Sequence, residues 1–248
     1  MDDSDVTALA DALRDAESTV ALTGAGLSRA SGVPTFRGDD GLYETFDESA
    51  FALRRFRADP DGFWRDWLAL HEHFFDEAVA PNAAHDALAT LEREGVLDAV
   101  LTQNVDGLHA AAGTESVVHL HGTGSTATCE ACGDEVGVEA ANAVVEETDA
   151  APECDCGSVY KPDTVLFGER LPEDALAAAR RRAARADVLV AAGSSLTVDP
   201  AASLPAVTRR EGGTVAVVNL EATRYADRAD LVFRERVEDV LPAVVDAL

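Results

Sequence analysis

Basic residues are scarce in this sequence: 20 lysines and arginines stand against 46 aspartates and glutamates, and the formal net charge is −26. Lys161 is the only lysine. Nucleic-acid phosphates are bound by clustered lysine and arginine, and no basic stripe is visible, so we expect no direct contact with nucleic acid. The acids are spread along the whole chain. This favours a hydrated coat adapted to a very salty cytoplasm over an acidic surface that recruits a basic partner such as a lysine-rich tail.

Long apolar runs are missing as well. The longest fall far short of the roughly 20 residues that a membrane-spanning helix needs, so we expect no membrane contact. The acidic start of the chain, residues 1–5, does not resemble the basic-then-apolar pattern of a signal peptide. With 47% apolar residues among 248, the chain is typical of a globular protein. We therefore expect a cytoplasmic protein of one large domain, or of one domain with insertions.

Cysteines number only four, and they fall into two close pairs. Two residues separate Cys129 from Cys132, one separates Cys154 from Cys156, and twenty-one lie between the pairs. This spacing is typical of a zinc ribbon, and a glycine follows each pair, which suits a tight knuckle around a metal. Disulfides are disfavoured in a reducing cytoplasm, and a redox pair would leave the other pair unexplained. We expect one structural zinc ion, since four thiolates close its coordination shell.

Strand-like and helix-like segments alternate along the chain, which predicts an α/β fold with a Rossmann-like parallel sheet flanked by helices. Six apolar runs are interpreted as buried strands: Thr19–Thr23, Val96–Thr102, Ser116–Leu120, Val188–Ala192, Thr214–Asn219 and Asp230–Phe233. Helices are expected at Ser4–Ala16, Ala83–Glu94, Asp106–Ala112, Pro172–Ala186, Pro200–Arg210 and Val237–Ala247.

Two stretches interrupt this alternation. Residues 38–80 are rich in aromatic and charged residues and predict a small helical insertion with its own apolar core. Residues 123–158 hold the cysteines, with a helical stretch rich in Glu and Ala between the pairs. The predicted small domain therefore combines the insertion, 38–80, with the zinc module, 123–158. The predicted Rossmann-like domain is discontinuous and consists of residues 1–37, 81–122 and 159–248.

Residues 20–38, VALTGAGLSRASGVPTFRG, begin like a nucleotide-binding turn, because a strand-like run meets Gly24-Ala-Gly26. A dinucleotide-binding unit would continue with a helix and a second strand that ends in an acid, within about thirty residues. The chain instead has Gly32, Pro34, an aromatic residue and an arginine, and residues 40–60 show no such strand. This argues against a nicotinamide oxidoreductase.

Three polar segments follow predicted strands: LTQNVDGLH (101–109), HLHGTG (119–124) and AAGSSLTVDP (191–200). Each is weak evidence alone, since clusters of Asn, Asp and Gly are usually turns. Ligands of open α/β sheets bind at the carboxyl ends of the strands, so these segments together predict a site beside the Gly24-Ala-Gly26 turn.

Eight motifs, in order along residues 20–240, resemble the sirtuins, a family of NAD-dependent protein lysine deacylases. They are Gly24-Ala-Gly-Leu-Ser28, Gly32-Val-Pro-Thr-Phe-Arg37, Thr102-Gln-Asn-Val-Asp106, His121-Gly122, the four cysteines, Phe167-Gly168-Glu169, Gly193-Ser-Ser-Leu196 and Val218-Asn-Leu-Glu221. The resemblance implies that NAD is a co-substrate and that a neutral acyl group, acetyl most simply, leaves a protein lysine. The implied products are nicotinamide, 2′-O-acetyl-ADP-ribose and the free lysine.

The chemistry requires a base of near-neutral pKa to deprotonate a ribose hydroxyl, and histidine has such a pKa. His119 and His121 both qualify, because strand alternation would point them the same way. The resemblance selects His121 as the catalytic base. It also makes Asn104 catalytic, as a hydrogen-bond partner of the nicotinamide carboxamide. The other four histidines are expected to be structural or at the surface.

The resemblance assigns NAD contacts to a larger set of residues, with the glycine turn meeting the pyrophosphate at a helix N-terminus. These are Gly24, Ala25, Gly26, Ser28, Phe36, Arg37, Gln103, Asn104, Val105, Asp106, Gly193, Ser194, Ser195, Asn219 and Leu220. Substrate contacts are expected from Val165, Phe167, Gly168, Glu169 and Val198.

The acetylated protein segment is expected to bind as an extended strand, paired through backbone hydrogen bonds. Relatives that remove acidic acyl groups carry Tyr-x-x-Arg in the helical insertion, whereas this chain has WLALHEHFF at 67–75. A neutral acyl group is therefore expected, and longer fatty acyl chains stay open. Two alternatives remain. Mono-ADP-ribosyl transfer would use the same residues, and a nucleotide-binding or zinc scaffold would use them without catalysis.

Overall fold

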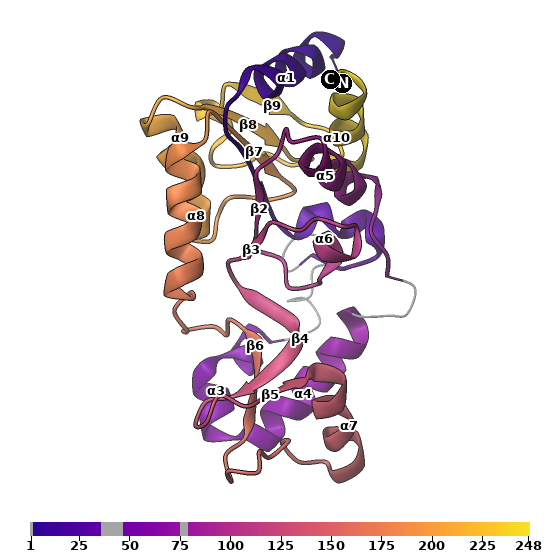
Figure 1. Cartoon of the computed structure of the whole chain (residues 1–248). Helices are drawn as coiled ribbons and strands as arrows, with labels where there is room; N and C mark the ends of the chain where they lie inside the picture. The colour runs from indigo at the N-terminus through magenta and orange to yellow at the C-terminus, as the bar shows by residue number, and fades with distance from the viewer. Residues whose placement is uncertain (1, 36–46, 75–78) are drawn as a thin grey trace.

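The computed structural model of the chain describes residues 2–35, 47–74 and 79–248 (Figure 1). Within these ranges the larger sheet has six parallel strands in the order β3-β2-β1-β7-β8-β9. Their bounds are β1 Thr19–Thr23, β2 Ala99–Thr102, β3 Val117–His119, β7 Val188–Ala192, β8 Thr214–Val218 and β9 Leu231–Phe233. The predicted parallel α/β sheet is confirmed, and β1 and β7 begin and end where expected.

Helices cover both faces of this sheet (Figure 1). Their bounds are α1 Asp3–Asp15, α5 Ala83–Arg93 and α10 Val237–Asp246 on one face, and α8 Glu173–Arg185 and α9 Leu204–Arg210 on the other. Strand alternation explains the two layers: Ala21 packs with the first group, while Val20 and Leu22 pack with the second. The termini lie together, since the Arg14 guanidinium donates hydrogen bonds to the last two carbonyl groups.

The described ranges also contain shorter elements. They are helix α6 Leu108–Ala111 and the 3₁₀ turns Ala25–Leu27, Arg29–Ser31, Glu48–Phe51, Ala201–Ser203 and Ala226–Arg228. No helix in the described ranges combines the length and the apolar character needed to cross a membrane.

A second, antiparallel sheet lies at the other end of the molecule, in the order β5-β4-β6 (Figure 1). Its strands are β4 Gly122–Cys129, β5 Glu135–Gly137 and β6 Tyr160–Thr164, and the helices α3 Leu53–Ala58, α4 Pro60–Phe74 and α7 Val138–Thr148 pack around it. Phe63 and Trp64 of α4 are fully buried there, and the Trp64 indole donates to the Tyr160 carbonyl at 2.9 Å. The buried aromatic residues of the described insertion thus form a core, as expected: Phe51, Phe56, Phe63, Trp64 and Trp67.

Strand β6 lies on the smaller sheet, although the sequence division placed residues 160–164 in the larger domain. The reason is that YKPDT contains a proline and two charged residues and gives no strand signal. A proline is accommodated because β6 is an edge strand, where a missing backbone N–H is tolerated.

Candidate active site

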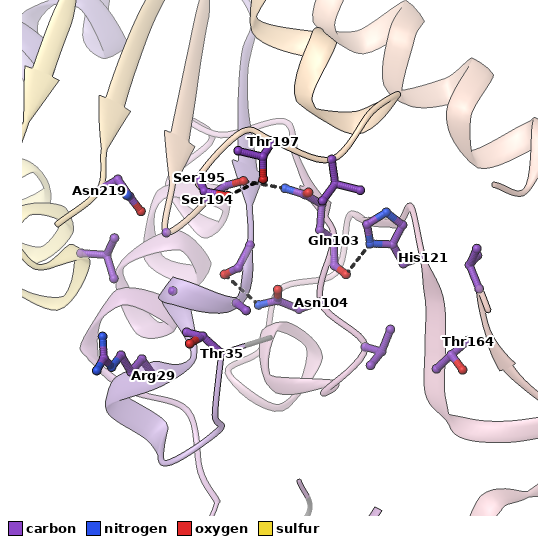
Figure 2. A pocket seen from close by; sticks show the side chains of 18 of the residues that line it. Arg29, Thr35, Gln103, Asn104, His121, Thr164, Ser194, Ser195, Thr197 and Asn219 are labelled. Atoms are coloured by element: carbon purple, nitrogen blue, oxygen red, sulfur yellow. Dashed lines mark hydrogen bonds between the residues drawn. The ribbon is translucent and has the colours of Figure 1, made fainter. Parts of the chain in front are cut away.

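The antiparallel sheet and the helices α3, α4 and α7 around it are called the smaller unit below. A cavity of about 760 Å³ lies between the carboxyl ends of the larger sheet and this smaller unit. Most of the predicted site residues line it: Gly24, Ala25, Gly26, Gln103, Asn104, Val105, His121, Val165, Phe167, Gly168, Glu169, Gly193, Ser194, Ser195, Val198, Asn219 and Leu220. Figure 2 shows Gln103, Asn104 and His121 side by side, with Ser194 and Ser195 above them. The volume lies within the range of small-molecule and cofactor pockets.

Two glycine turns meet at the end of β1 and β7, where the strand order changes direction. The Gly26 N–H donates to the Gly193 carbonyl at 2.8 Å, and the Gly193 N–H donates to Val218 at 2.9 Å. Gly193 has a φ of +64°, and a Cβ there would lie 2.2 Å from the Leu27 nitrogen. Close backbone approach therefore requires glycine. The chain after Gly24 forms two 3₁₀ turns, so the expected helix N-terminus is not an α-helix.

His121 presents one ring nitrogen as a base. Its Nδ1 lies 2.9 Å from the Gln103 carbonyl oxygen, which can only accept, so Nδ1 carries the proton (Figure 2). The Nε2 lone pair is then the acceptor. Burial lowers the pKa of His121 below its ordinary value, against an opposing effect of the Gln103 hydrogen bond. His121 is therefore neutral at pH 7, as a general base must be.

His119 is placed differently from His121. Strand β3 ends at His119, and the chain turns at residues 120–121 before β4 begins, so the alternation of one continuous strand does not apply. In the described lining of the cavity only His121 of the two appears. Strand alternation therefore does not relate the two side chains, because a strand end separates His119 from His121.

Asn104 is held from behind by a buried hydrogen-bond network. Its Nδ2 donates to the Gly24 carbonyl at 3.2 Å and to the Ser28 Oγ at 3.1 Å. Ser28 in turn donates to Asp106 Oδ2 at 2.6 Å. Ser28 and Asp106 thus stand behind Asn104, outside the described lining of the cavity. Their contacts fix the orientation of the Asn104 amide at the cavity wall.

The segment at residues 164–169 forms the wall on the side of the smaller unit. The Val165 N–H donates to the His121 carbonyl at 2.9 Å, which ties this wall to the base. Phe167 pairs with Ala52 in a parallel bridge. Phe167 is 37% exposed and Val198, on the opposite loop, is 41% exposed, so two apolar side chains face an open groove.

The cysteine cluster fits a metal ion. The four Sγ atoms lie within 4.8 Å of one another, and the Cys129–Cys156 and Cys132–Cys154 sulfurs are 3.5 Å apart. A disulfide would bring sulfurs to about 2.05 Å. Thiolates around a tetrahedral zinc at about 2.3 Å stand roughly 3.8 Å apart, which the cluster matches. The predicted knuckle glycines, Gly133 and Gly157, have φ of +78° and +84°. Zinc at this site would be structural.

A sequence profile of the Sir2 family matches residues 24–200. The chain belongs to the Sir2 family. It is 51% identical over its whole length to an NAD-dependent protein deacetylase of Haloarcula marismortui, covering 96% of that protein. It is 41% identical to NAD-dependent protein deacylase 1 of Archaeoglobus fulgidus, with 94% of each chain covered. A solved complex described as Sir2-p53 peptide-NAD⁺ is similar at a TM-score of 0.87, with 38% identity and 96% of each chain covered.

Two predicted NAD contacts of this Sir2-family chain, Phe36 and Arg37, lie outside the described residues. The described cavity wall also contains residues that the sequence analysis did not select: Arg29, Thr35, Trp67, His71, Thr197 and Glu221 among others. His71 was expected at the surface or in a structural role. Helix α4 brings it to the cavity, and its spacing from Trp67 is a helical turn, a signal that could have linked the two.

Two further histidines of the Sir2-family chain are buried beneath the cavity. The Thr23 hydroxyl and His109 Nε2 are 2.9 Å apart, and the His85 and His109 rings meet edge to face at 5.1 Å. Burial, followed by the neighbouring His85 and His119, lowers the pKa of His109 to about 3. Both rings are buried, and the contact with Thr23 places His109 against the end of strand β1.

Proposed function

We propose that this chain is an NAD-dependent protein lysine deacylase. It would move an acetyl or other neutral acyl group from lysine to ADP-ribose, releasing nicotinamide and forming 2′-O-acetyl-ADP-ribose. The observation that carries the proposal is the His121 imidazole, protonated on Nδ1, in one cavity with Asn104 and the paired glycine turns. The names of its relatives, deacetylases and a deacylase, support the same reaction.

The donor set of the cavity fits a dinucleotide. Ser194, Ser195 and Asn219 offer hydroxyl and amide groups at the strand ends (Figure 2), and the glycine turns offer close backbone approach. NAD, when bound, supplies a ribose whose nicotinamide is displaced by the acyl oxygen. Asn104 would orient the carboxamide, because the contacts with Gly24 and Ser28 hold its side chain in one position. Positioning would account for much of the rate, since the acyl oxygen is a weak nucleophile.

His121 would take the proton of a ribose hydroxyl on Nε2. The Gln103 carbonyl keeps the other ring nitrogen protonated and so aims the lone pair, while the lowered pKa keeps the ring neutral at pH 7. The rate should fall as the pH drops through this lowered pKa, because protonated His121 cannot accept a proton.

The acyl-lysine peptide would lie as a strand between residues 167–169 and the Leu196–Val198 segment. Val165, Phe167 and Val198 would contact its lysine stem, and Trp67 and Leu70 add apolar surface. Nothing cationic among these residues matches an acidic acyl group. A solved Sir2 structure with a propionylated peptide, 36% identical to this chain, supports a neutral group of about this size.

We propose that the enzyme acts in a reducing, salty cytoplasm. A zinc cluster of four cysteines that form no disulfide fits a reducing compartment. A net charge of −26 is compatible with a folded state where concentrated salt screens repulsion between the acids. Activity is therefore expected to require molar salt.

The test is nicotinamide release from NAD with an acetylated peptide in molar KCl. His121→Ala should lower kcat by about 10²–10⁴-fold while NAD binding and zinc content persist. His119→Gln is the matched control and should keep most activity. No NAD consumption by the unaltered protein would refute the function, and loss in His119→Gln alone would move the base to His119. Label transferred from NAD to protein would instead indicate ADP-ribosyl transfer.

A further inference from the structure

Lys161 is the only lysine of the chain, and it is buried. It lies on β6, where its ammonium donates to the carbonyl groups of Pro162 at 2.9 Å and Thr164 at 3.1 Å. Its third partner is Glu169 Oε2, at 3.2 Å. An ammonium has three N–H donors, so Lys161 is fully satisfied by these partners.

This ion pair differs from the others of the described residues. Every arginine that forms an ion pair there has a side chain at least 34% exposed, whereas the Lys161 side chain is 10% exposed. Exposed pairs contribute little to stability. A buried ammonium is costly unless its partners are well placed, and the three partners of Lys161 meet that condition.

Glu169 connects Lys161 with the turn formed by residues 166–169. Its Oε2 also accepts the Leu166 N–H at 2.9 Å, and the Leu166 carbonyl accepts the Glu169 N–H at 2.9 Å. Gly168, with φ of +84°, occupies the left-handed position of this turn. Leu166 is buried in the core of the smaller unit. Two hydrogen bonds therefore close the turn of residues 166–169, and the ion pair between Glu169 and Lys161 attaches this turn to strand β6.

The turn of residues 166–169 forms part of the cavity wall. The Phe167 side chain projects at the groove, the Phe167 N–H donates to Phe51 at 3.0 Å, and the neighbouring Val165 N–H donates to His121. A displacement of the turn would move the wall against which the peptide is expected to lie. The glycine turns and the strand ends proposed to bind NAD belong to the larger sheet. None of their residues is among the described hydrogen-bond or ion-pair partners of Lys161.

We infer that Lys161 and Glu169 are positioning residues for the acyl-lysine peptide: they hold the turn 166–169 in the shape with which the peptide strand pairs. The inference rests on the proposed function. It assigns the single lysine of the enzyme to peptide recognition rather than to NAD binding or to the proton transfer of His121. Peptide affinity should therefore respond to this ion pair, and NAD affinity should not.

The experiment compares Lys161→Met, Glu169→Gln and the double variant in steady-state assays that vary peptide and NAD separately. Methionine keeps the apolar stem and removes the charge, leaving the partly exposed Glu169 its contact with Leu166. The peptide KM should rise by about ten- to a hundredfold, with the NAD KM within about twofold. The double variant should be no worse than the poorer single variant, because the two residues act through each other.

Arg65→Met is the matched control. Arg65 pairs with Asp149 at 3.2 Å, the same separation as Lys161 and Glu169, but at an exposed site of the same unit. Its peptide KM should not change. Binding of a fluorescent acetyl-lysine peptide, followed by anisotropy, gives a second reading that needs no turnover, and zinc content reports folding.

An unchanged peptide KM in folded Lys161→Met or Glu169→Gln would overturn the inference. Equal rises in the KM of peptide and NAD, or the same rise in Arg65→Met, would overturn it as well, since each indicates a general loss of structure. If Lys161→Met does not fold, Lys161→Gln takes its place, because a change at Glu169 could also remove a direct contact with the peptide. An inactive unaltered enzyme would instead refute the proposed function, so the two failures are distinct.

Discussion

Acid should destabilise the folded protein through His109. This side chain on α6 is 2% exposed, and its Nε2 faces the Thr23 hydroxyl, which itself donates to Thr102. Nε2 therefore carries the proton, and Nδ1 finds no hydrogen-bond partner within the described residues. A second proton on Nδ1 would be a buried charge without an acceptor, beside His85. This explains why the pKa of His109 is lowered to about 3.

The sign follows from linkage. The unfolded chain takes up the proton near pH 6.5, and the folded chain takes it up near pH 3. Neutral His109 thus makes its full contribution to the free energy of unfolding above about pH 6.5. This contribution is lost as the pH falls, at about 1.4 kcal/mol per pH unit. At about pH 5 the loss amounts to about 2 kcal/mol, a large part of the 5–15 kcal/mol typical of a domain.

The assay is urea unfolding at fixed salt, at about pH 7.5 and about pH 5, for the unaltered chain and His109→Gln. Glutamine keeps a donor for Thr23 and cannot titrate. His85, His119 and the carboxylates titrate in both proteins, so the difference between the two pH dependences isolates His109. The unaltered chain should lose about 2 kcal/mol more than the variant. Equal losses would refute the reasoning and would mean that His109 stays accessible to protons.

Two further substitutions test the zinc cluster and the glycine turns. Cys129→Ala should lower zinc content and the midpoint of thermal unfolding, because three thiolates leave the shell open; a full equivalent of zinc in the variant would remove Cys129 from the ligand set. Gly193→Ala should cost about 3 kcal/mol or more in unfolding free energy and raise the KM for NAD, since its Cβ would meet Leu27. Gly212→Ala, also at positive φ (+95°) but with no atom within 4 Å, should cost only about 1 kcal/mol, and equal costs would contradict the clash.

Much of the larger sheet could be predicted because its strands are short apolar runs between polar turns. The burial of β1 and β7 on both faces produces that pattern directly. The smaller sheet could not be predicted in this way. Strand β4 mixes buried and partly buried positions over glycines and threonines, and β6 contains a proline, so neither shows a continuous apolar run.

The site shows the same division. The spacing of the paired cysteines indicates a zinc cluster, and the polar segments that follow predicted strands indicate a site at the carboxyl ends of the sheet. The choice between His119 and His121 depends on where β3 ends, and the wall contributed by His71 depends on how α4 docks. Neither contact is encoded by neighbouring residues, because each joins segments far apart in the chain.

By itself, then, the amino-acid sequence determined the strand positions of the larger sheet, the cysteine ligand set, the acidic character of the chain and the chemistry of the strand-end loops, all of which depend on residue type and local spacing. Only the tertiary structure decided which nitrogen of His121 is free, what buries His109 and what the single lysine binds. Those properties require a specific partner at hydrogen-bond distance, and the partners of His121, His109 and Lys161 are brought there by the folding of separate segments.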